Sequence, residues 1–98
     1  MSDCQTLDDV RAQIDRIDAE IVALLAERTG YARQAGRLKP TTAEVRALAR
    51  VEQVIARVRH LAAEHGAPPD LVERLYRTMI EGFTDMQLRE KEGNTASR

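Results

Sequence analysis

The sequence predicts an all-α protein built from three helices, one long and two shorter. Apolar residues recur at steps of three and four along most of the 98-residue chain, which is the period of a helix with one buried face. No stretch alternates apolar and polar residues between turn signals, so a β-sheet is not expected. A chain of this length forms at most one domain. We expect that domain to comprise residues 1–98, ordered from about 6 to 92 with flexible termini.

The first helix is expected to begin near Thr6 or Leu7 and to run to about Lys39. Thr6 and Asp9 have the spacing of a capping box, and Pro40 disfavours continuation of the helix. The apolar face of this helix, called the seam below, continues through Tyr31, Ala35 and Leu38. Its regular part consists of Val10, Ile14, Ile17, Ile21 and Leu24.

The length of the first helix bears on assembly. A helix of about 33 residues is roughly 50 Å long, and it would extend well beyond a compact globule of this chain length. Either the helix breaks at Gly30 or Gly36, or two chains bury their seams against each other. The strict three-four repeat is typical of helix-against-helix packing, so we favour an intertwined homodimer.

The second and third helices have clear start and stop signals. Thr41 and Glu44 again have capping-box spacing, Gly66 is a typical residue just after a helix end, and the turn "APPD" precedes a helix that begins near Asp70. The ending "GNTASR" indicates a frayed tail. The expected apolar stripes are Val45, Leu48, Val51, Ile55, Val58 and Ala62 on the second helix, and Val72, Leu75, Met79, Phe83 and Met86 on the third.

Composition disfavours several classes of function. The net charge is −1, from 15 basic and 16 acidic residues, so neither a nucleic-acid nor a membrane partner is expected. The single cysteine, Cys4, excludes a disulfide within the chain and a Cys/His metal site. The first residues lack the features of a signal peptide and no apolar run is long enough to cross a bilayer, so a cytoplasmic protein is expected.

The usual catalytic sets are also missing from the sequence. There is no Ser/His/Asp set, no glycine-rich phosphate loop and no metal-ligand cluster, and His60 and His65 are expected to face solvent. No metal and no cofactor is therefore expected. An enzyme with this inventory would depend on fixed positive charge and on shape.

Arg28 occupies a position of the seam that the repeat assigns to an apolar side chain. A buried guanidinium without an anion is costly. One interpretation is therefore a structural ion pair, and the other is a pocket that binds an anionic ligand. The candidate carboxylates for the ion pair are Asp18, Glu20 and Glu27.

Other cations lie at spacings that favour the pocket. Lys39 projects from the same side of the helix as Arg28, about 16 Å further along the axis. Arg46 and Arg50 are four residues apart and would share a face of the second helix, and Gln87 is a neutral donor beside the third stripe. Arg11 lies about 25 Å from Arg28, so it could serve the same small ligand only from a partner chain.

The stretch "LDDVRAQIDRIDAEIVALLAERTGYARQAGRLK" resembles the first helix of the all-helical chorismate mutases, the AroQ class, and the likeness extends to about Gln87. It rests on the arginine after the opening apolar pair, the "ID" that follows, "LLAER" and the distal lysine. The resemblance implies an intertwined dimer with two active sites. It also implies a small dicarboxylate substrate and a cofactor-free Claisen rearrangement of chorismate to prephenate.

The resemblance further implies roles for individual residues. Arg28, Lys39, Arg50 and Gln87 would line the site, and Arg11 would come from the partner chain. Arg11 and Arg28 would hold the two carboxylates of the substrate. Lys39 and Gln87 would face the ether oxygen, which gains negative charge as the C–O bond breaks. The implied catalytic residues are therefore Lys39, Gln87 and Arg28.

The sequence departs from the usual mutase pattern at three positions. Val51 replaces a common glutamate, Ala47 a common aspartate and Phe83 a frequent serine. These changes and "RLKPTTAEVRALARV" look more like the isochorismate-pyruvate lyase branch, which forms salicylate and pyruvate from isochorismate. Val51 and Phe83 would then contact the substrate. A mutase is our first hypothesis, a lyase the second, and a non-catalytic helical dimerisation module the third.

Overall fold

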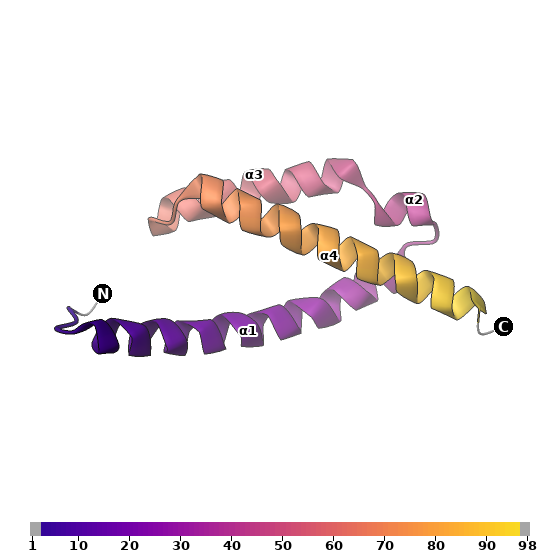
Figure 1. Cartoon of the computed structure of the whole chain (residues 1–98). Helices are drawn as coiled ribbons and strands as arrows, with labels where there is room; N and C mark the ends of the chain where they lie inside the picture. Colours follow the sequence, from indigo (N-terminus) through magenta and orange to yellow (C-terminus); the bar gives the residue numbers. More distant parts are fainter. Residues whose placement is uncertain (1–2, 97–98) are drawn as a thin grey trace. The chain divides into compact units, whose positions relative to one another are not determined.

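A computed structural model describes residues 3–96 of the chain, which are helical over most of their length and contain no strand (Figure 1). The all-α prediction is confirmed. Contacts divide the chain into two compact units, Met1–Tyr31 and Ala32–Arg98, and each is described by itself below. The helices are α1 (Leu7–Leu38), α2 (Thr42–Val45), α3 (Leu48–His65) and α4 (Pro69–Ala96).

Helix α1 is continuous over 32 residues, through both Gly30 and Gly36, which gives a length of about 48 Å. Its start is fixed by the predicted capping box. The amide of Asp9 donates to Oγ1 of Thr6 at 3.1 Å, and the amide of Thr6 donates to Oδ2 of Asp9 at 3.2 Å. Two of the unpaired amides at the helix start are thereby satisfied.

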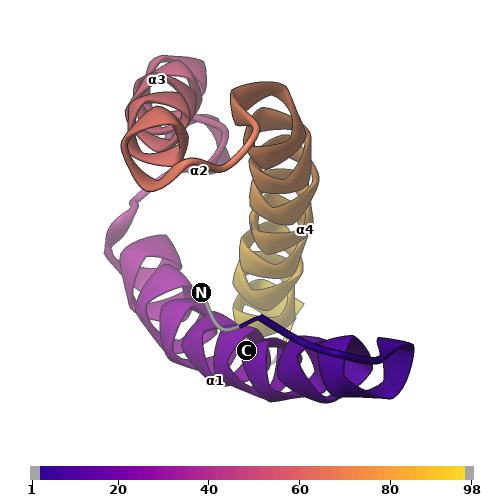
Figure 2. The ribbon, with the colours of Figure 1, turned by 90° about the vertical axis from the view of Figure 1, so that its left-hand side faces the viewer.

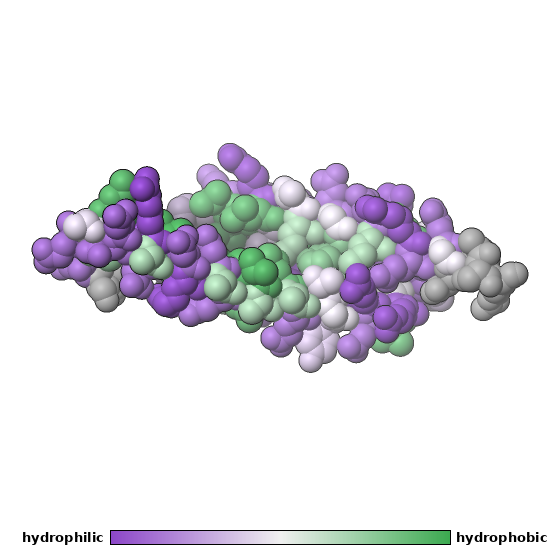
Figure 3. All heavy atoms as spheres, turned by 60° about the horizontal axis from the view of Figure 1, so that its bottom comes forward, coloured by the Kyte–Doolittle hydropathy of each residue, from purple (hydrophilic) through white to green (hydrophobic). Residues whose placement is uncertain are grey.

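The seam of α1 is largely exposed in the single chain. The side chains of its regular part keep between 40% and 65% of their surface, and hydrophobic residues lie among hydrophilic ones on the surface of the molecule (Figure 3). A row of half-exposed aliphatic side chains is typical of a contact surface rather than of a solvated face. The exposed fractions are Val10 40%, Ile14 50%, Ile17 42%, Ile21 48% and Leu24 65%.

The prediction of one continuous second helix was wrong. The structure has the four-residue α2, capped by Oγ1 of Thr41, which accepts from the amide of Glu44 at 3.2 Å. The chain then leaves helical geometry at Ala47, with φ −18° and ψ 79°. This break separates Arg46 from Arg50, so they do not share a face of one helix. It also lets Val45, only 4% exposed, pack as part of α2 on α4.

The core differs from the predicted stripes at three positions. Leu48 and Leu75, which the stripes placed inside, are 78% and 59% exposed. Val54, which the stripes omitted, is buried beside the predicted Ile55, Val58 and Ala62. The buried apolar residues among those described are Val45, Val54, Ile55, Val58 and Ala62.

Helices α3 and α4 run side by side in opposite directions (Figures 1 and 2). Gly66 ends α3 as predicted, with φ 77°, a left-handed conformation that glycine adopts at low cost. Helix α4 begins at Pro69 and continues to Ala96, so the helix includes part of the segment expected to fray. Adding residues to an established helix is inexpensive compared with nucleating one. Residues 97–98 lie outside the described part.

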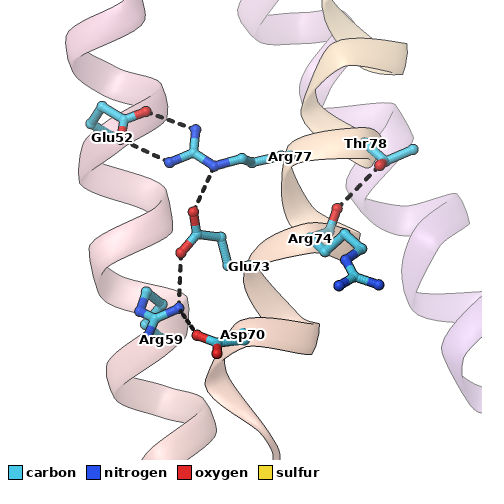
Figure 4. Close-up of polar contacts among 7 residues, drawn as sticks. All are labelled: Glu52, Arg59, Asp70, Glu73, Arg74, Arg77 and Thr78. Carbon is cyan, nitrogen blue, oxygen red and sulfur yellow. Dashed lines mark hydrogen bonds and ion pairs between the residues drawn. The ribbon is translucent and has the colours of Figure 1, made fainter.

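Five charged side chains join α3 to α4 (Figure 4). Arg77 binds both carboxylate oxygens of Glu52, at 2.8 and 2.9 Å, and its Nε donates to Glu73 at 2.7 Å. Arg59 donates to Glu73 and to Asp70, both at 2.9 Å. The hydrogen bonds from Arg77 lower the pKa of Glu52 and of Glu73 below the usual glutamate value. The two-pronged arginine contact gives this network a defined geometry.

Candidate active site

The structure brings Lys39 and Gln87 together within the second unit. Lys39 follows the last residue of α1 and is half-buried, while Gln87 lies on α4 and is only 6% exposed. Nζ of Lys39 donates to Oε1 of Gln87 at 3.4 Å, which is the long end of the hydrogen-bond range. The neighbour of the ammonium group is thus a neutral amide, which leaves the positive charge uncompensated by that contact.

The amide of Gln87 has a second partner on α1. Its Nε2 donates to the backbone carbonyl of Ala32 at 2.6 Å. A buried primary amide needs partners for both its oxygen and its nitrogen, and Gln87 has them on two sides. The side chain is therefore held from α1 at one end and by Lys39 at the other.

The last turns of α1 are fastened to α4 by one further contact, between Arg33 and Glu90. Nε of Arg33 donates to Oε1 of Glu90 at 2.8 Å, with both side chains more than a third exposed. Exposed ion pairs of this kind contribute little to stability. Arg33 lies one helical turn before Gly36, and Glu90 lies one turn after Gln87. The ion pair therefore helps define how the two helix segments meet.

The contacts of α1 with Gln87 were missed by reasoning from the sequence. Ala32 contributes only its backbone, and the sequence around Gly36 indicates only a possible break of the helix. The signal in the sequence for this contact was the pair of small residues Ala32 and Gly36, four apart on one helix. Such a pair permits another element to approach closely.

Three further predicted site residues lie in the second unit, and one of them, Phe83, stands one helical turn before Gln87 on α4. Arg50 is exposed in the first turn of α3, and its Nη1 donates to Oε1 of Gln53 at 2.7 Å. Val51 and Phe83 are half-buried, on α3 and α4. The guanidinium of Arg50 is thus directed along its own helix, while the two apolar side chains retain surface that a ligand can contact.

Arg11 and Arg28 lie on α1 in the first unit, Arg11 exposed and Arg28 half-buried. The unbroken helix keeps them about 25 Å apart along its axis, more than one small ligand spans. Their joint action on one substrate therefore requires two chains, and the contribution of Arg11 across a dimer stays a prediction.

Other kinds of site find little support among residues 3–96. His60 and His65 are exposed, as predicted, and Cys4 is exposed as well. This part of the chain has no group of three or more His, Cys, Asp or Glu side chains placed to hold a metal ion. Nor does it have a helix long and apolar enough to cross a membrane.

The chain as a whole matches a known class of protein. The model of the family described as chorismate mutase type II matches residues 10–88, and this chain belongs to that family. It is similar to the isochorismate pyruvate lyase of Pseudomonas aeruginosa. The two are 34% identical over 87 residues, which cover 89% of this chain and 86% of that protein.

Proposed function

We propose that the chain is a cofactor-free enzyme that converts chorismate to prephenate in a cationic pocket. The observation that carries this proposal is the Lys39–Gln87 pair, in which Nζ lies 3.4 Å from a neutral amide oxygen. A fixed ammonium group whose neighbour is neutral is suited to stabilise negative charge that develops on a substrate. Membership of the chorismate mutase type II family supports the same substrate class.

The reaction needs positioning and charge rather than a nucleophile. As the C–O bond of chorismate breaks and the new C–C bond forms, the ether oxygen becomes partly negative. Lys39 donates to that oxygen through the ammonium protons that are not bound to Gln87. The second proton of the Gln87 amide, which Ala32 does not engage, is available to the same oxygen. Removing one such donor typically slows a reaction by about a hundredfold to a thousandfold.

The two carboxylates of the substrate are assigned to arginines. Arg28 of one chain and Arg11 of a partner chain would each bind one carboxylate, with Arg50 as a further cation at the site. Guanidinium groups bind carboxylates through two parallel hydrogen bonds, which also fixes orientation. The exposed seam of α1 supports a homodimer, because a second copy would cover it and bring Arg11 toward the other chain's Arg28. The compartment we propose is the cytoplasm.

A second reaction is favoured by the apolar residues Val51 and Phe83. Both are half-buried and offer no polar group to a ring hydroxyl, which suits a substrate whose hydroxyl stands elsewhere. The relative from Pseudomonas aeruginosa is an isochorismate pyruvate lyase. In the corresponding reaction, isochorismate would give salicylate and pyruvate, and the same ether oxygen would gain charge as its bond to the ring breaks.

One pair of assays separates these proposals from a non-catalytic dimerisation module. Purified protein is incubated with chorismate and with isochorismate in separate reactions, and prephenate, salicylate and pyruvate are measured. Prephenate supports the mutase and salicylate the lyase. If neither product forms and neither substrate binds, the enzyme proposal is wrong.

Variants then test the site. Arg28→Ala and Lys39→Ala are each expected to lower kcat/KM by at least about a hundredfold, because each removes a charge that contacts the substrate. Arg16→Ala on the same helix is the matched control, since Arg16 is exposed and pairs with Glu20. Full activity of Arg28→Ala would refute its assignment to the site.

A further inference from the structure

The Gln87 side chain leaves no room for a side chain at Gly36 on α1. A Cβ atom built on Gly36 would lie 2.7 Å from Cγ of Gln87 and 3.2 Å from its Cβ and Cδ. Contacts below 3.0 Å are essentially never seen for real Cβ atoms. Gly36 is buried within a regular helix and has no positive φ. Glycine is therefore needed at this position for space and not for backbone freedom.

The contacts of the Gln87 amide fix which way it points. Its nitrogen donates to the carbonyl of Ala32, and its oxygen accepts from Lys39. The flipped amide would set oxygen against the Ala32 carbonyl and an NH₂ group against an ammonium group, so both contacts would become repulsive. The orientation with Oε1 toward Lys39 is thus set by two partners that cannot be exchanged.

We propose that Gly36 is a positioning residue of the active site, which acts through Gln87 on Lys39. Gly36 and the Ala32 carbonyl form a seat for the Gln87 side chain, and the seated amide holds the ammonium group through its oxygen. The expected effect on kcat rests on the proposed function, whereas the contacts of Gln87 with Ala32 and Gly36 that form the seat do not. A side chain as small as alanine at position 36 displaces Gln87 and releases Lys39.

The seat is tested directly by NMR of the Gln87 side-chain amide, assigned by the loss of its cross-peaks in Gln87→Ala. In the wild type, this NH₂ group is expected to exchange slowly with water and to shift in Lys39→Met. Rapid exchange typical of an exposed glutamine, or no shift in Lys39→Met, would overturn the proposal. Both measurements avoid any change at position 36, so they do not depend on the folding of a Gly36 variant.

Gly36→Ala is then compared with Gly30→Ala, which adds the same methyl group to the same helix where no atom lies within 4 Å. Gly36→Ala should move the Gln87 cross-peaks and Gly30→Ala should leave them in place. With whichever substrate the wild type converts, Gly36→Ala should lower kcat about tenfold to a hundredfold with little change in KM, as expected for a misplaced catalytic group. Unchanged cross-peaks and kcat in Gly36→Ala would refute the proposal.

A double-mutant cycle separates positioning from a general structural effect. In a Gln87→Ala background, Gly36→Ala has no glutamine to displace and is expected to cause no further fall in kcat. A fall by the same factor as in the wild type would mean that Gly36 acts independently of Gln87. If the wild type converts neither substrate, the proposed function fails, while the amide measurements still decide the existence of the seat.

Discussion

Replacing Ile14 by glutamate places a carboxylate in the middle of the seam of α1 and tests whether a second copy of the chain covers that seam. Ile14 is 50% exposed in the single chain, so the charge can be solvated there at little cost. In a homodimer the same carboxylate would be enclosed between two apolar surfaces, without a partner designed for it. The change should therefore affect association far more than the helix itself.

The size of the effect follows from the exposed fraction. Complete burial of an isoleucine side chain contributes about 1.5–3 kcal/mol, and Ile14 retains half of its surface, so covering the remainder contributes about 1 kcal/mol. A symmetric dimer contains this contact twice, and desolvation of each carboxylate adds to the loss. The dissociation constant should rise by a factor of at least about 100.

Sedimentation equilibrium measures this directly. The wild type is expected to have twice the chain mass of 11.0 kDa, and Ile14→Glu is expected to dissociate at concentrations where the wild type does not. Ala12→Glu is the matched control, because Ala12 is exposed and lies about 160° around the helix from Ile14. A monomeric wild type, or equal dissociation of the two variants, would refute the assignment of the seam to a homodimer.

Three further predictions concern stability and are measured by urea unfolding followed by circular dichroism. Arg77 lowers the pKa of Glu52, so the stabilisation from this ion pair is complete above the unfolded pKa of 4.5 and is lost as the pH falls through the lower folded pKa. Glu52→Gln should therefore make the free energy of unfolding fall less steeply as the pH is lowered, and an equally steep fall in both proteins would contradict this. Ile55→Ala, at a side chain 4% exposed, should lower the free energy of unfolding by about 2–4 kcal/mol, against less than about 0.5 kcal/mol for Leu48→Ala at an exposed position. Gly66→Ala should cost about 1–2 kcal/mol, since alanine is strained at the left-handed φ of 77°, and an unchanged midpoint would show that the turn relaxes.

The parts of the fold that local chemistry controls could be predicted from the sequence. The start of α1 follows from Thr6 and Asp9, and the end of α3 follows from Gly66, because each signal acts on backbone groups within a few residues. The break at Ala47 could not be predicted in this way. Alanine is the best helix former. The chain leaves the helix there because Val45 is buried against α4, which lies far from it in the sequence.

The same distinction applies to the site. Lys39 was marked by its spacing from Arg28, and Gln87 was marked as a neutral donor beside the third apolar stripe. The seat formed by Ala32 and Gly36 depends on which turn of α1 faces α4, and that register is a property of the packed helices. Arg11 and Arg28 depend in addition on a partner chain, so their roles stay predictions.

The close contact between Gly36 and Gln87 also limits how the chain can evolve. A larger residue at position 36 is incompatible with a long side chain at position 87, so neither position can change freely while the other stays the same. In other members of the family, alanine at the position of Gly36 should accompany a shorter residue at the position of Gln87. The two positions are thus expected to change together in evolution, although one lies on α1 and the other on α4.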